Sequence, residues 1–106
     1  MHRKAELEEE ARQYQLRLER EQRERQRKFE QTRINRLLDE VALLRQAIDI
    51  RTYVEAVRAR VANESGVTPV DAVHRWSHWA LAEADRIDPV RNGRFLHADE
   101  EGDREN

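Results

Sequence analysis

Cysteine is absent from this 106-residue chain, and glycine, proline and aromatic residues are scarce. Without cysteine there is no disulfide framework, no cysteine-based zinc module and no thiol nucleophile. Three glycines are too few for a glycine-rich phosphate-binding loop. No apolar run approaches the roughly 20 residues that span a bilayer, and no apolar stretch of a secretory signal follows Met1. We therefore expect a cytoplasmic protein.

Charged residues make up 40% of the chain and hydrophobic residues 38%, which is typical of long solvated helices and leaves little for a core. The apolar side chains are concentrated in the middle of the chain. Acidic residues outnumber basic ones five to one in residues 99–106. We therefore divide the chain into a charged, solvated helix at 1–33, a helical module at 34–96 and a disordered acidic tail at 97–106.

Residues 5–63 contain neither proline nor glycine and are mostly strong helix formers, which predicts one helix or two helices in tandem. Near the start, apolar residues recur with the spacing of a coiled-coil seam: Leu7, Ala11, Tyr14 and Leu18. Residues 19–28 have no apolar side chain. Acidic residues one turn before basic ones are expected to support the helix: Glu8 with Arg12, Glu19 with Arg23, Glu21 with Arg25 and Glu24 with Lys28.

A second apolar stripe begins at Ile34 and continues at alternating spacings of three and four: Leu37, Val41, Leu44 and Ile48, with Leu38 beside it. After Ala47 the apolar residues change phase: Ile50, Val54, Val57 and Val61, with Tyr53 beside them. This change predicts either a bend near Asp49 or a partner that shifts its line of contact. Asn63, Ser65 and Gly66 signal the helix end.

The next helix is predicted to begin with Thr68 as its cap, Pro69 in the first helical position and Asp71 in the first turn. It should end near Ile87, where Asp88 and Pro89 stop it. Its apolar line is Val70, Val73, Trp76, Ala80, Ala84 and Ile87. Because the connection is short, this helix should fold back on residues 41–61 as an antiparallel αα-hairpin. The predicted fold class is therefore all-α.

Beyond the hairpin, Asn92 and Gly93 predict a turn, after which Phe95 and Leu96 are expected to pack back on the hairpin. The dipole of the helix opposes carboxylates at its C-terminal end, so capping does not account for Asp85 and Asp88. We expect these two carboxylates to form ion pairs instead. Their candidate partners are Arg58 and Arg60 on the facing helix, and Arg86 and Arg91 nearby.

Two motifs, DIRTYVEAVR at residues 49–58 and WSHWALAEADRIDPV at residues 76–90, resemble the C-terminal region of a group of uncharacterised bacterial proteins. In the longer members a Glu/Arg-rich helix precedes both motifs, and a helix-turn-helix-like segment expected to bind DNA lies near the N-terminus. That segment has no counterpart in this chain. The resemblance, over roughly residues 30–92, implies a tail module, either as a short gene product or as a truncated one, and implies no activity.

The last helix carries the candidate metal ligands Asp71, His74 and His78, which share one helical face with Asp85. Imidazoles and a carboxylate in this arrangement suit zinc, although Arg75 stands where helical metalloproteases have their catalytic glutamate. A solvated polar face explains the same residues. We expect neither a bound metal nor a cofactor.

A two-helix module of this size buries too little surface to be stable alone, so we expect a homo-oligomer or a larger protein partner. The predicted contact residues are Leu37, Val41, Leu44, Ile48, Tyr53, Trp76 and Trp79. Trp76 lies on the apolar line and is expected in the core. Trp79 lies at its border, opposite Tyr53, where aromatic residues often anchor a partner.

The arginine-rich helix raises the question of nucleic-acid binding, for which the candidate contacts are Arg23, Arg25, Arg27 and Lys28. Phosphate binding needs uncompensated positive charge, whereas here the signs are interleaved. No catalytic constellation is found. The sequence therefore predicts a non-enzymatic helical oligomerisation or protein-interaction module. The alternative is an accessory or truncated tail of a DNA-associated regulator that touches nucleic acid weakly through this helix.

Overall fold

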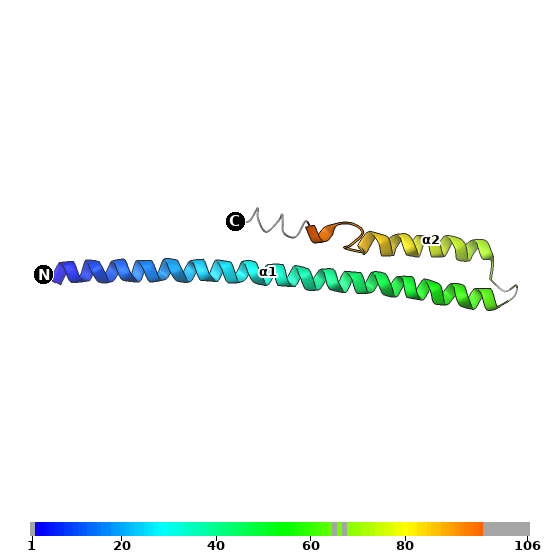
Figure 1. Ribbon diagram of the computed structural model, residues 1–106, viewed down its shortest axis with the longest axis horizontal. Helices are drawn as coiled ribbons and strands as arrows, with labels where there is room; N and C mark the ends of the chain where they lie inside the picture. Colours follow the sequence, from blue (N-terminus) through cyan, green and yellow to red (C-terminus); the bar gives the residue numbers. More distant parts are fainter. Residues whose placement is uncertain (1, 65, 67, 97–106) are drawn as a thin grey trace. The chain divides into compact units, whose positions relative to one another are not determined.

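The computed structural model describes residues 2–64, 66 and 68–96 of the chain. The described residues contain two helices, α1 (His2–Asn63) and α2 (Val70–Ile87), followed by a helical turn at residues 94–96, and no strand (Figure 1). The predicted all-α fold is confirmed. α1 is one continuous helix rather than two in tandem, and the phase change near Asp49 does not interrupt it. The acidic tail predicted at 97–106 lies outside the described residues.

The chain divides into two units, Met1–Ile34 and Asn35–Asn106. The described part of the first unit is a single stretch of α1 whose side chains are nearly all exposed. Leu7 and Tyr14 of the predicted seam are 58% and 57% exposed. Tyr14 is covered in part by Arg17, whose guanidinium carbon lies 5.8 Å from the ring centre. This stretch of helix therefore contributes nothing to a core of its own.

Ion pairs in this stretch join residues three positions apart: Arg12 with Glu9, Arg27 with Glu24 and Arg33 with Glu30. The predicted pair of Arg12 with Glu8 is wrong by one residue, since Arg12 Nη2 lies 2.8 Å from Glu9 Oε2. Arg23 also differs from its prediction, because its Nε contacts the backbone carbonyl of Glu19 at 3.5 Å rather than the carboxylate. All these groups are exposed, so each pair contributes little to stability.

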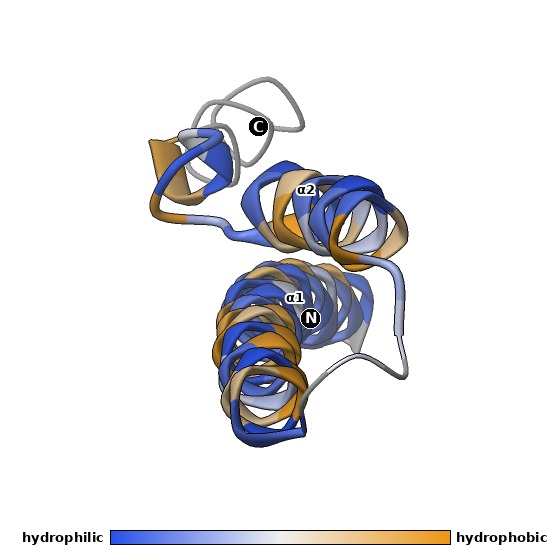
Figure 2. Cartoon of the chain, turned by 90° about the vertical axis from the view of Figure 1, so that its right-hand side faces the viewer, coloured by the Kyte–Doolittle hydropathy of each residue, from blue (hydrophilic) through white to orange (hydrophobic). Residues whose placement is uncertain are grey.

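The second unit is the predicted antiparallel hairpin, in which α2 turns back along the C-terminal part of α1 (Figures 1 and 2). The buried residues at its centre are small: Ala47 and Val54 on α1, and Ser77, Ala80 and Ala84 on α2. Small side chains let two helices approach closely. As a result the larger apolar side chains of α2, Val73, Trp76 and Ile87, are only half-buried at the edges of the interface.

The N-terminus of α2 differs from the prediction by one residue. Pro69 is extended, with φ −60° and ψ 126°, and its carbonyl accepts the first helical hydrogen bond from Val73 at 3.2 Å. Pro69 is therefore the cap and not the first helical residue, so the cap predicted at Thr68 is wrong. No side chain caps this end. Gly66, predicted in the left-handed region, has φ +88°.

The C-terminus of α2 ends where Asp88 and Pro89 were predicted to stop it. Asp88 is extended, with ψ 111°, while its N–H still donates to the carbonyl of Ala84 at 3.0 Å. Gly93, in the predicted turn, has φ +74°. Phe95 and Leu96 do not pack on the hairpin, since they are 49% and 60% exposed. The buried positions at this end are already occupied by Asp88 and Pro89.

Ser77 is an uncharged polar residue buried in the central layer between the helices. Its Oγ has no hydrogen-bond partner among the described residues. A buried polar atom without a partner costs about 1–3 kcal/mol. We therefore expect Ser77→Ala to raise the free energy of unfolding by about 1 kcal/mol, measured by thermal and urea denaturation. Thr52→Ala, on the exposed surface of α1, reports the gain from helix propensity alone. A lower stability of Ser77→Ala would contradict the prediction.

Candidate functional site

The register of the hairpin is held by an ion-pair cluster around Arg51 of α1. Its Nη2 donates to Asp85 Oδ1 at 3.0 Å and to Asp88 Oδ2 at 2.8 Å. Asp85 also accepts from Arg91 Nη1 at 3.0 Å. The Asp88 side chain is 5% exposed, whereas that of Asp85 is 44% exposed. Arg51 therefore joins the C-terminal part of α1 to the last turn of α2 and to the residue after it.

The ion pairs predicted for the two aspartates are right only in part. Arg91 does pair with Asp85. Arg58 and Arg60 were the predicted partners on α1, but the antiparallel register brings the end of α2 to Arg51, two turns earlier. Arg60 pairs with Glu64 and Arg86 with Glu83. This bridge was missed because its distance along the chain, 34 and 37 residues, carries no local signal.

Asp88 also caps the turn after α2, contrary to the expectation that capping does not account for it. Its Oδ1 accepts the backbone N–H groups of Val90 at 2.9 Å and Arg91 at 3.3 Å. The hydrogen bond from Arg51 lowers the pKa of Asp88 below its ordinary 3.8, and the two backbone donors lower it further against the opposing effect of desolvation. The hydrogen bonds that Arg51 donates to Asp88 and Asp85 raise the pKa of Arg51 in turn.

We expect Asp88→Asn to lower the midpoint of thermal unfolding at neutral pH by several degrees. Asparagine retains an acceptor for the turn but removes the charge that faces Arg51. Because folding lowers the pKa of Asp88 from 3.8, its ionised form stabilises the fold fully above that value, and the contribution disappears as the pH falls through the folded value. The difference between wild type and variant should therefore hold from about pH 7 down to about pH 4 and shrink below that pH.

The matched control is Asp85→Asn, because Asp85 contacts the same Nη2 of Arg51 but is far more exposed. Solvent screens its ion pairs, so its effect on the unfolding midpoint should be smaller. The hydrogen bond from Arg86 lowers the pKa of Glu83 as well. Because Glu83 is present in all three proteins, its effect on the pH dependence cancels when their unfolding midpoints are compared. Equal midpoints for wild type and Asp88→Asn at neutral pH would contradict the assignment of Asp88 as the main anion of the bridge.

The apolar stripe at residues 37–48 of α1 stays uncovered. Leu37, Val41 and Ile48 are 57%, 48% and 49% exposed, and Leu44 is half-buried. At 100° per residue these side chains lie about 120° around α1 from Val54, which faces α2. α2 also ends beside Arg51, just beyond the stripe. The structure thus leaves this predicted partner surface open.

The three aromatic contact residues lie on a different flank of the hairpin. The rings of Tyr53 and Trp76 meet edge to face, with centres 5.7 Å apart at an angle of 83°. Tyr53 was predicted to lie opposite Trp79, which is wrong, since Tyr53 meets Trp76 instead and Trp79 is 66% exposed. Trp76 is half-buried rather than a core residue, because the small residues beside it bring the helices too close to admit its ring. The predicted contact set is thus split between two surfaces.

A shallow groove of about 400 Å³ lies at the end of the hairpin near the loop. Its lining residues come from both helices and the loop: Val57, Arg60, Val61, Glu64, Thr68, Ala72, Val73 and Trp76. The two ionisable side chains of this lining pair with each other, since Arg60 Nε lies 3.0 Å from Glu64 Oε1. The groove therefore presents an apolar floor and a neutralised rim, without an arrangement suited to acid–base chemistry.

The candidate metal ligands Asp71, His74 and His78 are all exposed. Among the described residues no group of three or more histidine, aspartate or glutamate side chains is placed to hold a metal ion. Asp85, on the same face, is held by Arg51 and Arg91. The structure therefore does not bring the predicted set together as a site.

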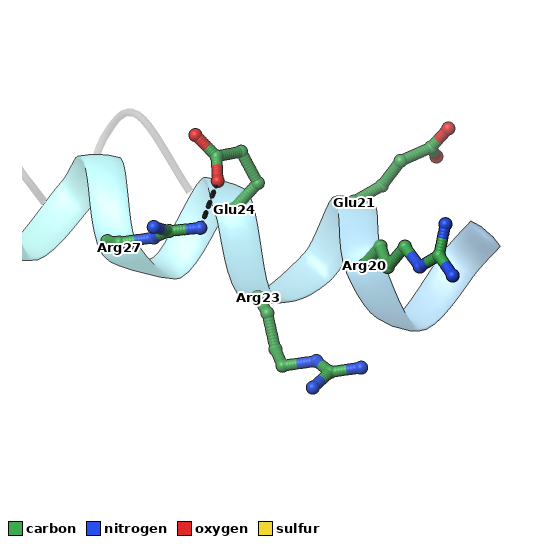
Figure 3. Close-up of a pocket in the computed structure, with 5 residues that line it drawn as sticks. All are labelled: Arg20, Glu21, Arg23, Glu24 and Arg27. Carbon is green, nitrogen blue, oxygen red and sulfur yellow. Dashed lines mark hydrogen bonds and ion pairs between the residues drawn. The ribbon is translucent and has the colours of Figure 1, made fainter. Parts of the chain in front are cut away.

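The candidate nucleic-acid contacts do not form a positive face. At 100° per residue, Arg25 lies on the opposite side of the helix from Arg23 and Arg27. Lys28 lies between those two sides. The residues that line the surface around Arg23 and Arg27 alternate between positive and negative charge: Arg20, Glu21, Arg23, Glu24 and Arg27. Figure 3 shows Arg27 paired with Glu24 and Arg23 pointing away from both glutamates. A phosphate backbone would meet carboxylates as well as guanidinium groups along this surface.

No protein-family model, curated protein or solved structure matches this chain. The resemblance to the tails of bacterial helix-turn-helix-like proteins therefore stays a prediction. In the part of the chain that the structure describes, neither helix combines the length and the apolar character needed to cross a membrane.

Proposed function

We propose that this chain is a non-enzymatic helical interaction module whose docking surface is the uncovered face of α1, formed by Leu37, Val41, Leu44 and Ile48. The observation that carries the proposal is the exposure of Leu37, Val41 and Ile48, with the half-buried Leu44 between them, along about three turns of one helix face. Exposed apolar patches of this kind are typical of protein–protein contact surfaces.

The ionisable groups of the hairpin support an architectural role. Those with a shifted pKa are Arg51, Glu83, Arg86 and Asp88, and each is engaged in an ion pair. Catalytic groups with a shifted pKa face a cleft where a substrate binds. Here Arg51 pairs with Asp88 across the hairpin, and Arg86 pairs with Glu83 on the same helix. Their arrangement favours a scaffold that presents α1 over one that carries out a reaction.

A site-specific photo-crosslinking experiment tests this surface. A benzoylphenylalanine placed at position 41 or 48 should form covalent adducts with protein in cells that express the chain, because both positions lie on the docking face. The matched controls are positions 39 and 46, which are also exposed but lie about half a turn away from that face. We expect adducts at 41 and 48 at least several-fold above those at 39 and 46.

Equal yields at all four positions, or adducts at 39 and 46 alone, would contradict the proposal. The crosslinked product also carries the mass of its partner, so a second copy of the chain and an unrelated protein are told apart on the same gel. Circular dichroism of each variant shows that the helices are retained, which is expected because all four positions are at the surface.

A further inference from the structure

The uncovered face of α1 follows a heptad repeat with a specific choice of residues. Val41 and Ile48 occupy successive a positions, and Leu37 and Leu44 occupy the d positions that precede them. Among parallel coiled coils, β-branched residues at a with leucine at d favour two strands over three or four. This face therefore has the side-chain pattern of a parallel helix dimer.

The charges that flank this seam are complementary for the same arrangement. Glu40 occupies a g position and Arg45 the following e position, and neither forms an ion pair with a described residue of its own chain. In a parallel, in-register pair, g of one helix lies beside the following e of the other. Glu40 of each copy then meets Arg45 of its partner, which gives two ion pairs. An antiparallel pair places g beside g, so Glu40 and Arg45 would not meet.

The position of α2 leaves room for a second copy of α1. The buried line on α1, formed by Ala47 and Val54, lies about 100° around the helix from the seam. Two helices packed about 9 Å from α1 at that angle are about 14 Å apart, which exceeds a helix diameter of about 10–12 Å. A partner helix therefore fits on the seam without displacing α2.

From these observations we infer that the occupant of the docking face is a second copy of this chain, paired parallel and in register through residues 37–48, with Glu40 bonded to Arg45 across the dimer. This inference rests on the proposed function and adds the identity and orientation of the partner. The seam is short, at two a and two d layers, so the dimer should dissociate in the micromolar range.

Charge reversal tests the pairing in purified protein by sedimentation velocity. Glu40→Arg makes both flanking positions basic, and Arg45→Glu makes both acidic. Each variant alone should dimerise about tenfold more weakly than wild type, since two exposed ion pairs become repulsions. An equimolar mixture of the two should regain dimers as a heterodimer, detected by a tag on one chain. No gain on mixing, or unchanged dimerisation of the single variants, would overturn the inference.

Single cysteines test the orientation, because the chain has no cysteine of its own. In the parallel pair, Leu37→Cys and Ile48→Cys should each be joined to its own copy by a short bismaleimide crosslinker. In an antiparallel pair, position 37 lies near position 48, so only a mixture of the two variants would crosslink efficiently. That second result would overturn the parallel arrangement.

The two proposals fail in different ways. If the wild-type chain sediments only as a monomer at about 100 µM, well above the expected dissociation range, the inference that a second copy occupies the docking face is wrong. If positions 41 and 48 still crosslinked to another protein in cells, the docking face would stand and only its occupant would change. Val41→Glu is the matched variant for both assays. It should abolish the dimer while the near-ultraviolet signal of the Tyr53–Trp76 pair remains, because Val41 lies outside the hairpin interface.

Discussion

The contact of Arg51 with Asp88 is the constraint on which the hairpin depends. One guanidinium nitrogen reaches the last turn of α2 through Asp85 and the following residue through Asp88, at 3.0 and 2.8 Å. The Asp88 carboxylate is almost fully buried, and a buried charge is tolerated only where its partners compensate it. Arg51 and two backbone N–H groups provide that compensation. The same carboxylate thereby sets the register of the helices and shapes the chain after α2.

The hairpin that results has a narrow core. Its buried residues are mostly alanine, with Val54 as the largest side chain that is fully buried. Such a layer brings the helices close but removes little apolar surface from water, so burial alone stabilises it weakly. The larger apolar side chains, among them Val41, Ile48 and Trp79, lie outside this layer. The capacity of the sequence for hydrophobic burial is thus only partly used within one chain.

Local signals in the sequence predicted the elements well, because they act over a few residues. The lack of proline and glycine up to Asn63 predicted a helix, and Asp88 followed by Pro89 predicted where α2 ends. Contacts between the helices were predicted less well. Arg51 was not among the expected partners of the aspartates, and Tyr53 was placed beside the wrong tryptophan. These contacts depend on how far α2 slides along α1 and how it turns about its axis, which residue spacing alone does not specify.

The sequence by itself determined that this protein is all-α, that its helices form an antiparallel hairpin, and that Leu37, Val41, Leu44 and Ile48 share one face. Helical periodicity and turn-forming residues are sufficient for each of these. Only the tertiary structure decided which of the two apolar lines on α1 meets α2. The line through Val54 does so, because its small neighbours allow close packing and Arg51 beside it holds the end of α2. The other line is left at the surface, where it is open to a partner.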